Sequence, residues 1–230
     1  MHPTAKSNCK SFFEAYLNAF PGAQRLKIVE IGSQDVNGSL REVAPPTCEY
    51  VGVDFVEGKG VDVVLTDPYS LPLESESADI VLSSSCFEHS EMFWIVYLEI
   101  LRVLKPRGLL YLNVPSNGAF HRYPVDCWRF YPDSGRALVS WARRNGMNAA
   151  LLESYVSAQV EDIWNDFVAV FVKDEAFAAE FPQRILEKKT DFQNGLLYGT
   201  SEFLKRSMSP EDQMKLAVIS RIISNQIKIV

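Results

Sequence analysis

Hydrophobic residues along this 230-residue chain fall into short runs that are separated by polar turns and by stripes at helical spacing. Short apolar runs bounded by turn residues are typical of buried strands, and apolar residues three or four positions apart are typical of one helix face. The pattern predicts seven strands, over 27–31, 50–55, 61–65, 78–83, 109–114, 149–156 and 167–172. It predicts helices over 7–20, 91–104 and 133–145, with a short helical piece over 40–43.

The alternation of strands and helices predicts an α/β fold built from parallel βαβ units. Right-handed crossovers between such units place helices on both faces of a doubly wound sheet. The alternation ends near Lys173. We therefore divide the chain into a domain over 1–173, which includes the N-terminal helix, and a helical extension over 174–230.

The extension shows no convincing strand before its last few residues. Its segment Ser209-Pro210-Glu211-Asp212 is a strong helix start, because an N-cap serine, a first-turn proline and first-turn acids all favour a helix N-terminus. An apolar stripe at helical spacing follows, formed by Leu216, Ile219, Ile223 and Ile227, with Val218 and Ile222 beside it. We expect this stripe to pack on its own domain, with a homodimer interface or a cover over the active site as the alternative.

The composition is that of an ordinary globular protein, with 47% hydrophobic residues, 23% charged residues and a net charge of -6. The negative charge and the lack of a basic run argue against nucleic acid as a partner. No apolar run is long enough to span a membrane, and no apolar leader begins the chain. The four cysteines form no CxxC pair, so we expect free thiols and a cytoplasmic location.

Two predicted strands end in an acid, the first at Glu30 and the second at Asp54. Adjacent parallel strands bring their carboxyl ends to the same edge of a sheet, where ligands of open α/β folds bind. Gly32 follows Glu30 closely, and Asp54 lies about 20 residues further on, at the spacing where an acid binds ribose hydroxyls. Each acid could instead merely end a strand, but the pair with a glycine between them indicates a nucleotide site.

The loop after the first strand does not suit a pyrophosphate. A dinucleotide fingerprint needs G-x-G-x-x-G, whereas this loop reads Gly32-Ser33-Gln34-Asp35-Val36-Asn37-Gly38. Only its first glycine is in place, and the acid Asp35 would repel phosphate. A nucleoside cofactor without phosphate fits better, and S-adenosylmethionine is such a cofactor.

The chain resembles the class I S-adenosylmethionine-dependent methyltransferases of the small-molecule kind called type 11, over about residues 26–172. Four segments carry the resemblance: VEIGSQ, YVGVDF, LTDPYSLPLESESADIVLSSSCFEH and LEILRVLKPRGLLYLNVPS. The family's loop usually reads E/D-x-G-x-G-x-G, and here Gln34 and Val36 replace the later glycines. The resemblance implies a seven-stranded Rossmann-like sheet whose last strand, 167–172, is antiparallel.

The resemblance also implies where S-adenosylmethionine binds. Glu30 and Gly32 would line its methionine end, and Asp54 would hold the ribose hydroxyls. Asp67 would face the adenine amino group with Pro68 beside it, and Ser84 and Ser85 would lie beneath the sulfonium. The other cofactor contacts expected are Ser33, Gln34 and Phe55.

The segment after the fifth strand, 114–134, is dense in aromatic and hydrogen-bonding side chains. A loop of this kind at a strand's carboxyl end is where we expect contacts to a small-molecule or glycan acceptor, with a hydroxyl as the methylated group. The candidates for acceptor binding are Arg122, Tyr123, Asp126, Trp128 and Arg129. The alternative is a structural corner, in which Trp128 and Phe130 are core and Asp126 and Arg129 form an internal ion pair.

His121 in this segment and His89 after the fourth strand are the candidate catalytic bases. His89 could instead cap the following helix. We expect no metal, because the strand ends carry no cluster of acids and amides beyond the residues already assigned to the cofactor. The rival functions are an NAD(P)-dependent Rossmann oxidoreductase and a non-catalytic binding protein on the same fold.

Overall fold

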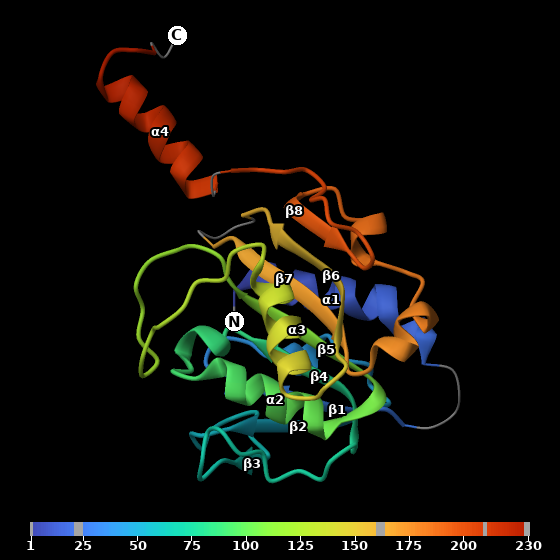
Figure 1. The fold of residues 1–230 in the computed structure, drawn as a ribbon. Coiled ribbons are helices and arrows are strands. Elements are labelled where there is room, and N and C mark those ends of the chain that lie inside the picture. Colours follow the sequence, from blue (N-terminus) through green and yellow to red (C-terminus); the bar gives the residue numbers. More distant parts are fainter. Residues whose placement is uncertain (1, 21–24, 160–163, 209–210, 228–230) are drawn as a thin grey trace.

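The computed structural model describes residues 2–20, 25–159, 164–208 and 211–227. Within these ranges an eight-stranded sheet forms the centre of the molecule, in the order β3-β2-β1-β4-β5-β7-β6-β8 (Figure 1). The strands are β1 (Lys27–Ile31), β2 (Glu49–Asp54), β3 (Val63–Val64), β4 (Ala78–Ser84), β5 (Leu104–Pro115), β6 (Ala150–Ser157), β7 (Asp166–Val172) and β8 (Phe192–Leu197).

Helices cover both faces of this sheet (Figure 1). The α-helices are α1 (Pro3–Tyr16), α2 (Phe93–Val103), α3 (Ser134–Arg144) and α4 (Glu211–Ile223). Short 3-10 helices lie between the main elements, at η1 (Leu17–Ala19), η2 (Leu40–Glu42), η3 (Phe87–His89), η4 (Glu175–Glu180) and η5 (Ile185–Glu187). The predicted doubly wound α/β architecture is confirmed.

The direction of the strands also agrees with expectation. Strands β1 to β5 are mutually parallel where they pair, whereas β7 runs antiparallel to both β5 and β6. The expected antiparallel strand over 167–172 is therefore β7. Chain connectivity changes direction between β1 and β4, because β2 and β3 extend to one side of β1 while β5 lies on the other.

The side-chain alternation of the strands builds two cores. Val29 of β1 and Val81 of β4 belong to the core that includes residues of α2 and α3. Ile28 and Ile80, one position earlier on the same strands, belong to the core that contains α1. Because both faces are covered, the central strands are apolar at consecutive positions, which is why they are recognisable in the sequence.

Three elements differ most from their predicted bounds, whereas the bounds of the other predicted strands and α-helices among the described residues agree to within two residues. Helix α1 begins at Pro3 rather than at residue 7, since a proline in the first turn is compatible with a helix start; the predicted stop at Pro21-Gly22 lies outside the described residues. Strand β3 has only two residues. Strand β5 begins at Leu104 rather than at residue 109. Leu104 pairs with Ala78 of β4 and Leu109 with Ile80, so the pairing register shifts over the turn-forming residues 105–108.

The expectation of no strand within the extension before its last residues was wrong. Strand β8 pairs antiparallel with β6 and forms an edge of the sheet. Its sequence, FQNGLL, lacks the alternation that marks a strand. The strand itself is irregular at this point, since Asn194 adopts a φ of +49° and the pairing register between β6 and β8 shifts beside it. The extension therefore contributes to the sheet as well as carrying α4.

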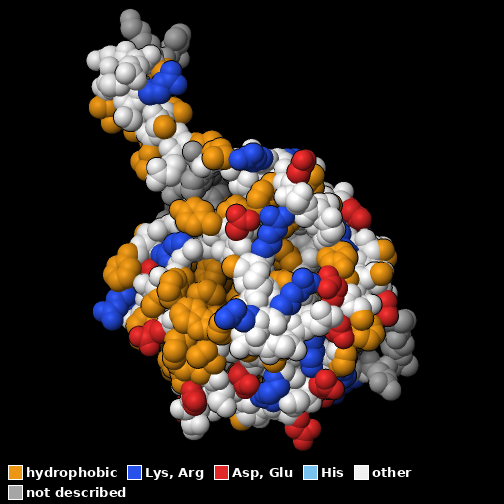
Figure 2. All heavy atoms as spheres, viewed as in Figure 1, with side chains coloured by type: hydrophobic (Ala, Val, Ile, Leu, Met, Phe, Trp, Pro, Cys, Tyr) orange, Lys and Arg blue, Asp and Glu red, His pale blue; other side chains and the backbone are white. Residues whose placement is uncertain are grey.

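Helix α4 projects away from the sheet (Figure 1), and hydrophobic side chains are visible along it in Figure 2. Leu216, Ile219 and Ile223 are 57%, 49% and 77% exposed, so the apolar stripe does not pack on its own domain in this structure. The helix-start residues Ser209 and Pro210 lie outside the described residues, and Ile227 lies beyond the helix end at Ile223. No helix in the described ranges combines the length and apolarity needed to cross a membrane.

A buried carboxylate connects α1 to the extension. Glu153 of β6 is fully buried and accepts hydrogen bonds from the Tyr16 hydroxyl at 2.7 Å and from the backbone N–H groups of Ile185 at 2.7 Å and Leu186 at 3.0 Å. Burial raises the pKa of this carboxyl. Three donors from two segments therefore converge on one side chain between α1 and η5.

We expect Glu153→Gln to destabilise the protein by about 1–3 kcal/mol, because one amide nitrogen would face a buried N–H donor. Tyr16→Phe is the control, since it removes one donor and leaves the carboxylate in place; its expected cost is about 0.5–1.5 kcal/mol. Urea unfolding measures both. A Glu153→Gln variant no less stable than Tyr16→Phe would contradict this account of the junction.

Candidate functional site

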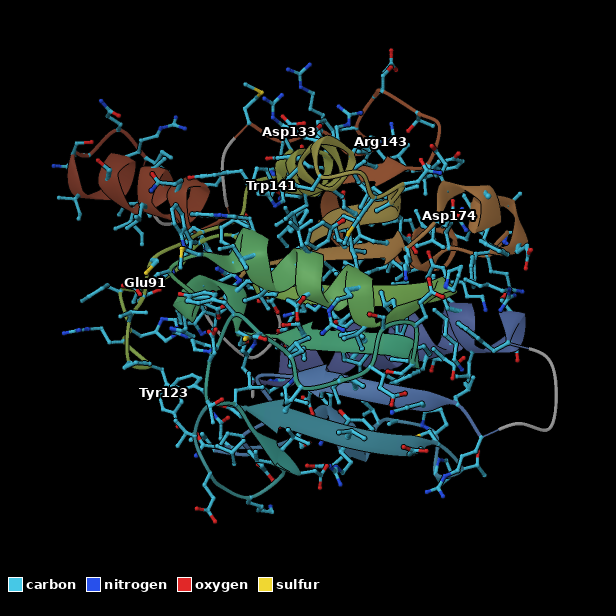
Figure 3. The ribbon with its side chains drawn as sticks, turned by 60° about the horizontal axis from the view of Figure 1, so that its bottom comes forward. Glu91, Tyr123, Asp133, Trp141, Arg143 and Asp174 are labelled. Carbon is cyan, nitrogen blue, oxygen red and sulfur yellow. The ribbon has the colours of Figure 1, made fainter. Side chains whose placement is uncertain are left out.

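A cavity of about 540 Å³ opens at the carboxyl ends of β1, β2 and β4. It lies at the point where the strand order reverses, which is the usual ligand site of open α/β sheets. Two of its lining residues, Glu91 and Tyr123, are labelled in Figure 3 at the end of the sheet toward which the parallel strands point, whereas Asp174 lies at the opposite end.

The loop after β1 approaches the loop after β4 very closely at Gly32. Gly32 has a φ of +79°, and a Cβ atom added there would lie 2.7 Å from the Cβ of Cys86. The N–H groups of Gly32 and Ser33 both donate to the carbonyl of Val53, at 2.9 and 3.2 Å. A glycine is therefore needed here for two reasons, the left-handed backbone and the lack of room.

The two strand-end acids both line the cavity, as the sequence predicts. Asp54 is 8% exposed, and its two oxygens accept backbone N–H groups from Gln34 at 3.0 Å and from Val56 at 3.2 Å. Each of these oxygens keeps a further lone pair for a ligand hydroxyl. Asp54 is therefore fixed in position by the loop it faces.

Glu30 is 2% exposed and accepts a hydrogen bond from the Tyr50 hydroxyl at 2.7 Å. Burial raises the pKa of Glu30 to about 7, against the opposing influence of the Tyr50 hydrogen bond and the Arg41 charge. A cationic group in the cavity would favour the charged carboxylate, because opposite charges lower the pKa of an acid.

The cavity wall also offers buried hydroxyl groups. The side-chain oxygens of Ser33 and Ser84 are buried and have no hydrogen-bond partner among the described residues. Both serines line the cavity, together with Ser85, whose φ of +51° is rarely adopted by side-chain-bearing residues. Buried polar atoms are normally hydrogen-bonded, so these hydroxyls fit contacts to a polar ligand.

Most residues assigned to the cofactor from sequence lie on this one cavity. The lining set contains Glu30, Gly32, Ser33, Gln34, Asp54, Phe55, Pro68, Ser84 and Ser85. Asp67 is outside it. Its side chain is exposed and accepts a hydrogen bond from the N–H of Tyr69 at 2.9 Å. The adenine contact assigned to Asp67 stays a prediction that this geometry does not support.

The predicted acceptor segment divides into a cavity part and a structural part. His121, Arg122 and Tyr123 line the cavity. The Tyr123 hydroxyl donates a hydrogen bond to the side-chain oxygen of Gln34, which joins this segment to the loop after β1. The acceptor segment thus lies over the predicted cofactor side of the cavity.

Asp126, Trp128 and Arg129 do not line the cavity. Of the structural alternative, the Asp126–Arg129 pair and the buried Phe130 are present, whereas Trp128 is 37% exposed and is not core. The Arg129 guanidinium holds both Asp126 oxygens, at 2.6 and 2.9 Å, and this pair holds the pKa of Asp126 down at about 2. Asp126 also accepts the N–H of His121 at 2.7 Å. The Trp128 indole donates to the carbonyl of Ser90 at 2.9 Å, so it connects this corner to the segment before α2.

The two candidate histidines, 32 positions apart in sequence, meet at the cavity wall. Their ring centroids are 4.8 Å apart and nearly perpendicular. The Nδ1 of His89 lies 2.6 Å from the carbonyl of Val125, which can only accept, so Nδ1 is the donor and Nε2 bears the lone pair. Burial lowers the pKa of His89, which favours its neutral form.

The sequence analysis missed several cavity residues, among them His2, Trp164 and Glu88. His2 and Trp164 line the cavity from opposite ends of the domain sequence, and their ring centroids are 6.4 Å apart. Glu88 also lines it and is 1% exposed; burial raises the pKa of this carboxyl to about 8. Only the Glu-His pair before α2 could have drawn attention to Glu88, because single residues outside a motif carry no signal.

Comparison with known proteins places this site in context. Residues 33–112 match the family model described as a methyltransferase domain. Over 154 residues the chain is 29% identical to an uncharacterized methyltransferase of Mycolicibacterium paratuberculosis, and the match covers 66% of this chain and 56% of that protein. The chain therefore spans about half the length of this relative.

Solved structures share the fold at low sequence identity. A methyltransferase from Burkholderia thailandensis, solved with 1,6-didemethyltoxoflavin and S-adenosylhomocysteine, has a TM-score of 0.56 at 14% identity, covering 74% of this chain and 79% of its own. The [4+2]-cyclase SpnF has a TM-score of 0.54 at 14% identity, covering 74% and 81%. These similarities establish the fold.

We expect Asp126→Asn to destabilise the protein by about 1–3 kcal/mol, because it removes charge-assisted hydrogen bonds from a buried acid. The matched control is Asp133→Asn, which breaks an exposed pair with Arg136 at the same i,i+3 spacing and should cost less than about 1 kcal/mol. Denaturant unfolding at neutral pH compares the two variants.

The contribution of Asp126 should also depend on pH in one direction. Its pKa is lowered by folding, so the stabilisation is present above the ordinary value of 3.8 and is lost as the pH falls toward about 2. Equal costs for Asp126→Asn and Asp133→Asn at neutral pH would refute a structural role for the buried pair.

Proposed function

We propose that this chain is a class I S-adenosylmethionine-dependent methyltransferase that transfers a methyl group to a hydroxyl of a small-molecule or glycan acceptor. The match of residues 33–112 to a methyltransferase-domain model supports this proposal. The observation that carries this proposal is the placement of Glu30, Gly32 and Asp54 on one cavity at the reversal of strand order. The acceptor segment lines the same cavity through His121, Arg122 and Tyr123.

The residues present fit this cofactor. Asp54 can accept hydrogen bonds from a ribose diol, and Glu30 is a buried acid that a cationic amino group would stabilise in its charged form. The buried hydroxyls of Ser33 and Ser84 supply further polar contacts. When bound, S-adenosylmethionine supplies an electrophilic methyl group on a positively charged sulfonium.

The protein's contribution is alignment and proton handling. The hydrogen bond between Tyr123 and Gln34 connects the acceptor segment to the cofactor loop and so helps to align the two substrates. The carbonyl of Val125 orients the His89 ring, and neutral His89 or His121 can accept the proton of an attacking hydroxyl.

The geometry disfavours a dinucleotide-dependent oxidoreductase. Rossmann folds bind the pyrophosphate at the N-terminus of the helix that follows the first strand. In the described part of this chain, β1 is followed by the three-residue η2 and then by β2. Asp35 also lies in the loop, paired with Lys59 at 2.6 Å.

A non-catalytic protein on this fold is the second candidate. The exposed apolar stripe of α4 favours it, because such a face is suited to association with a partner, including a second copy of this chain. The two functions differ in a simple readout. An enzyme transfers labelled methyl groups from S-adenosylmethionine to hydroxylated acceptors, and a scaffold does not.

We expect Asp54→Asn to weaken binding of S-adenosylhomocysteine at least tenfold, or about 1.4 kcal/mol, by removing charge-assisted hydrogen bonds to the ribose. The matched control is Asp79→Asn at the amino end of β4, where the carboxylate pairs with Lys105 at 2.7 Å, away from the cavity. Isothermal titration calorimetry measures both variants. Unchanged affinity in folded Asp54→Asn would rule out the ribose assignment.

A further inference from the structure

Three potential metal ligands meet on the acceptor side of the cavity. A carboxylate oxygen of Glu88 and one ring nitrogen each of His89 and His121 all lie within 4.8 Å of one another. Glu88 and His89 belong to η3, after β4, and His121 comes from the segment after β5. All three residues line the cavity.

Two potential metal-ligand atoms face each other in this cluster. Because Nδ1 of His89 donates to Val125, its Nε2 presents a lone pair, and this atom lies 3.7 Å from Oε1 of Glu88. That distance is too long for a hydrogen bond between them. A cation between the two atoms would satisfy both.

The Glu88 carboxylate lacks the contacts that a buried acid requires. It is 1% exposed, and its Oε2 has no hydrogen-bond partner among the described residues. The nearby Arg129 directs its guanidinium to both oxygens of Asp126 instead. Buried carboxylates are normally paired or bound to a metal, so this oxygen is an independent sign of a missing ligand.

Both histidines have the outer contacts typical of metal ligands. A ligating histidine usually donates its other ring N–H to a backbone carbonyl or a carboxylate, which fixes the tautomer. His89 does so to Val125. The Nδ1 of His121 lies 3.3 Å from the carbonyl of Ala119 and 3.5 Å from an oxygen of Asp126.

We propose that Glu88, His89 and His121 form a binding site for a divalent transition-metal ion of the Zn²⁺ class. Two imidazoles and one carboxylate suit such ions, whereas Mg²⁺ prefers oxygen ligands alone. Ligands about 2.1 Å from a tetrahedral ion are about 3.4 Å apart, so the cluster must contract on binding. His121, whose side chain is 41% exposed, has the freedom to move inward.

The position of the site suggests its use. A three-ligand site leaves coordination positions open, and here these would face the cavity, where they can take an oxygen atom of the acceptor. This role rests on the proposed methyl transfer, but metal binding itself does not. In the metal-bound protein, His89 and His121 are ligands rather than bases.

The test is calorimetric titration of Zn²⁺ into chelator-treated, tag-free protein. We expect one equivalent to bind, and Glu88→Gln and His121→Ala each to weaken binding at least tenfold. The matched controls are Glu91→Gln and His2→Ala, which alter another acid and the third histidine of the same cavity outside the cluster. Neither control should change Zn²⁺ affinity more than about twofold.

Co²⁺ provides a second readout, because its visible absorption reports nitrogen and oxygen ligation directly and should disappear in His121→Ala. S-adenosylhomocysteine is titrated into the same samples; retained binding shows that the variants are folded. Three results would overturn the metal site. They are the absence of saturable Zn²⁺ binding, a Zn²⁺ affinity of folded His121→Ala equal to that of the native protein, and Mg²⁺ binding as tight as Zn²⁺ binding. If the native protein binds Zn²⁺ but does not bind S-adenosylhomocysteine, the result counts against the proposed methyl transfer and not against the metal site.

Discussion

The close contact between the loops after β1 and β4 is the constraint on which the site depends. It requires a glycine at position 32, because a side chain there would overlap Cys86 and because the backbone is left-handed. With this contact in place, the backbone of Gly32 and Ser33 is anchored to the end of β2 through Val53. The three parallel strands therefore end in register, and their polar ends surround one cavity.

The chemistry of the cavity changes from one side to the other. The side formed by β1 and β2 carries Glu30 and Asp54, which suit a cofactor with a ribose and positively charged groups. The side formed by η3 and the segment after β5 carries two histidines with Glu88 beside them. The hydrogen bond between Tyr123 and Gln34 connects the two sides.

Local pattern was sufficient for the central strands and for the placement of Glu30 and Asp54 at one edge of the sheet. Strand β1 matches its predicted bounds, and Glu30 and Asp54 lie where the ends of adjacent parallel strands require. The bounds of a strand depend on hydrophobic periodicity, and the place of a strand-end acid depends on its position along one strand. The sequence shows both of these directly. Strand β8 was missed because Asn194 interrupts its alternation, and its pairing with β6 is a tertiary contact.

The arrangement of residues on the predicted acceptor side of the cavity could be seen only in the three-dimensional structure. The sequence offered Asp126, Trp128 and Arg129 as acceptor contacts. Polar and aromatic residues also occur in structural corners, and here the three make hydrogen bonds within the protein and do not line the cavity. The meeting of His89 with His121, and the entry of His2 and Trp164, depend on how separate loops pack. No local pattern encodes such contacts between distant segments.

The central claim is that the cavity binds a phosphate-free nucleoside cofactor. Calorimetric titration of the native chain with S-adenosylhomocysteine and with NADH tests it most directly. The account predicts saturable binding of S-adenosylhomocysteine at one site per chain and no binding of NADH. Saturable binding of NADH with no response to S-adenosylhomocysteine would contradict it.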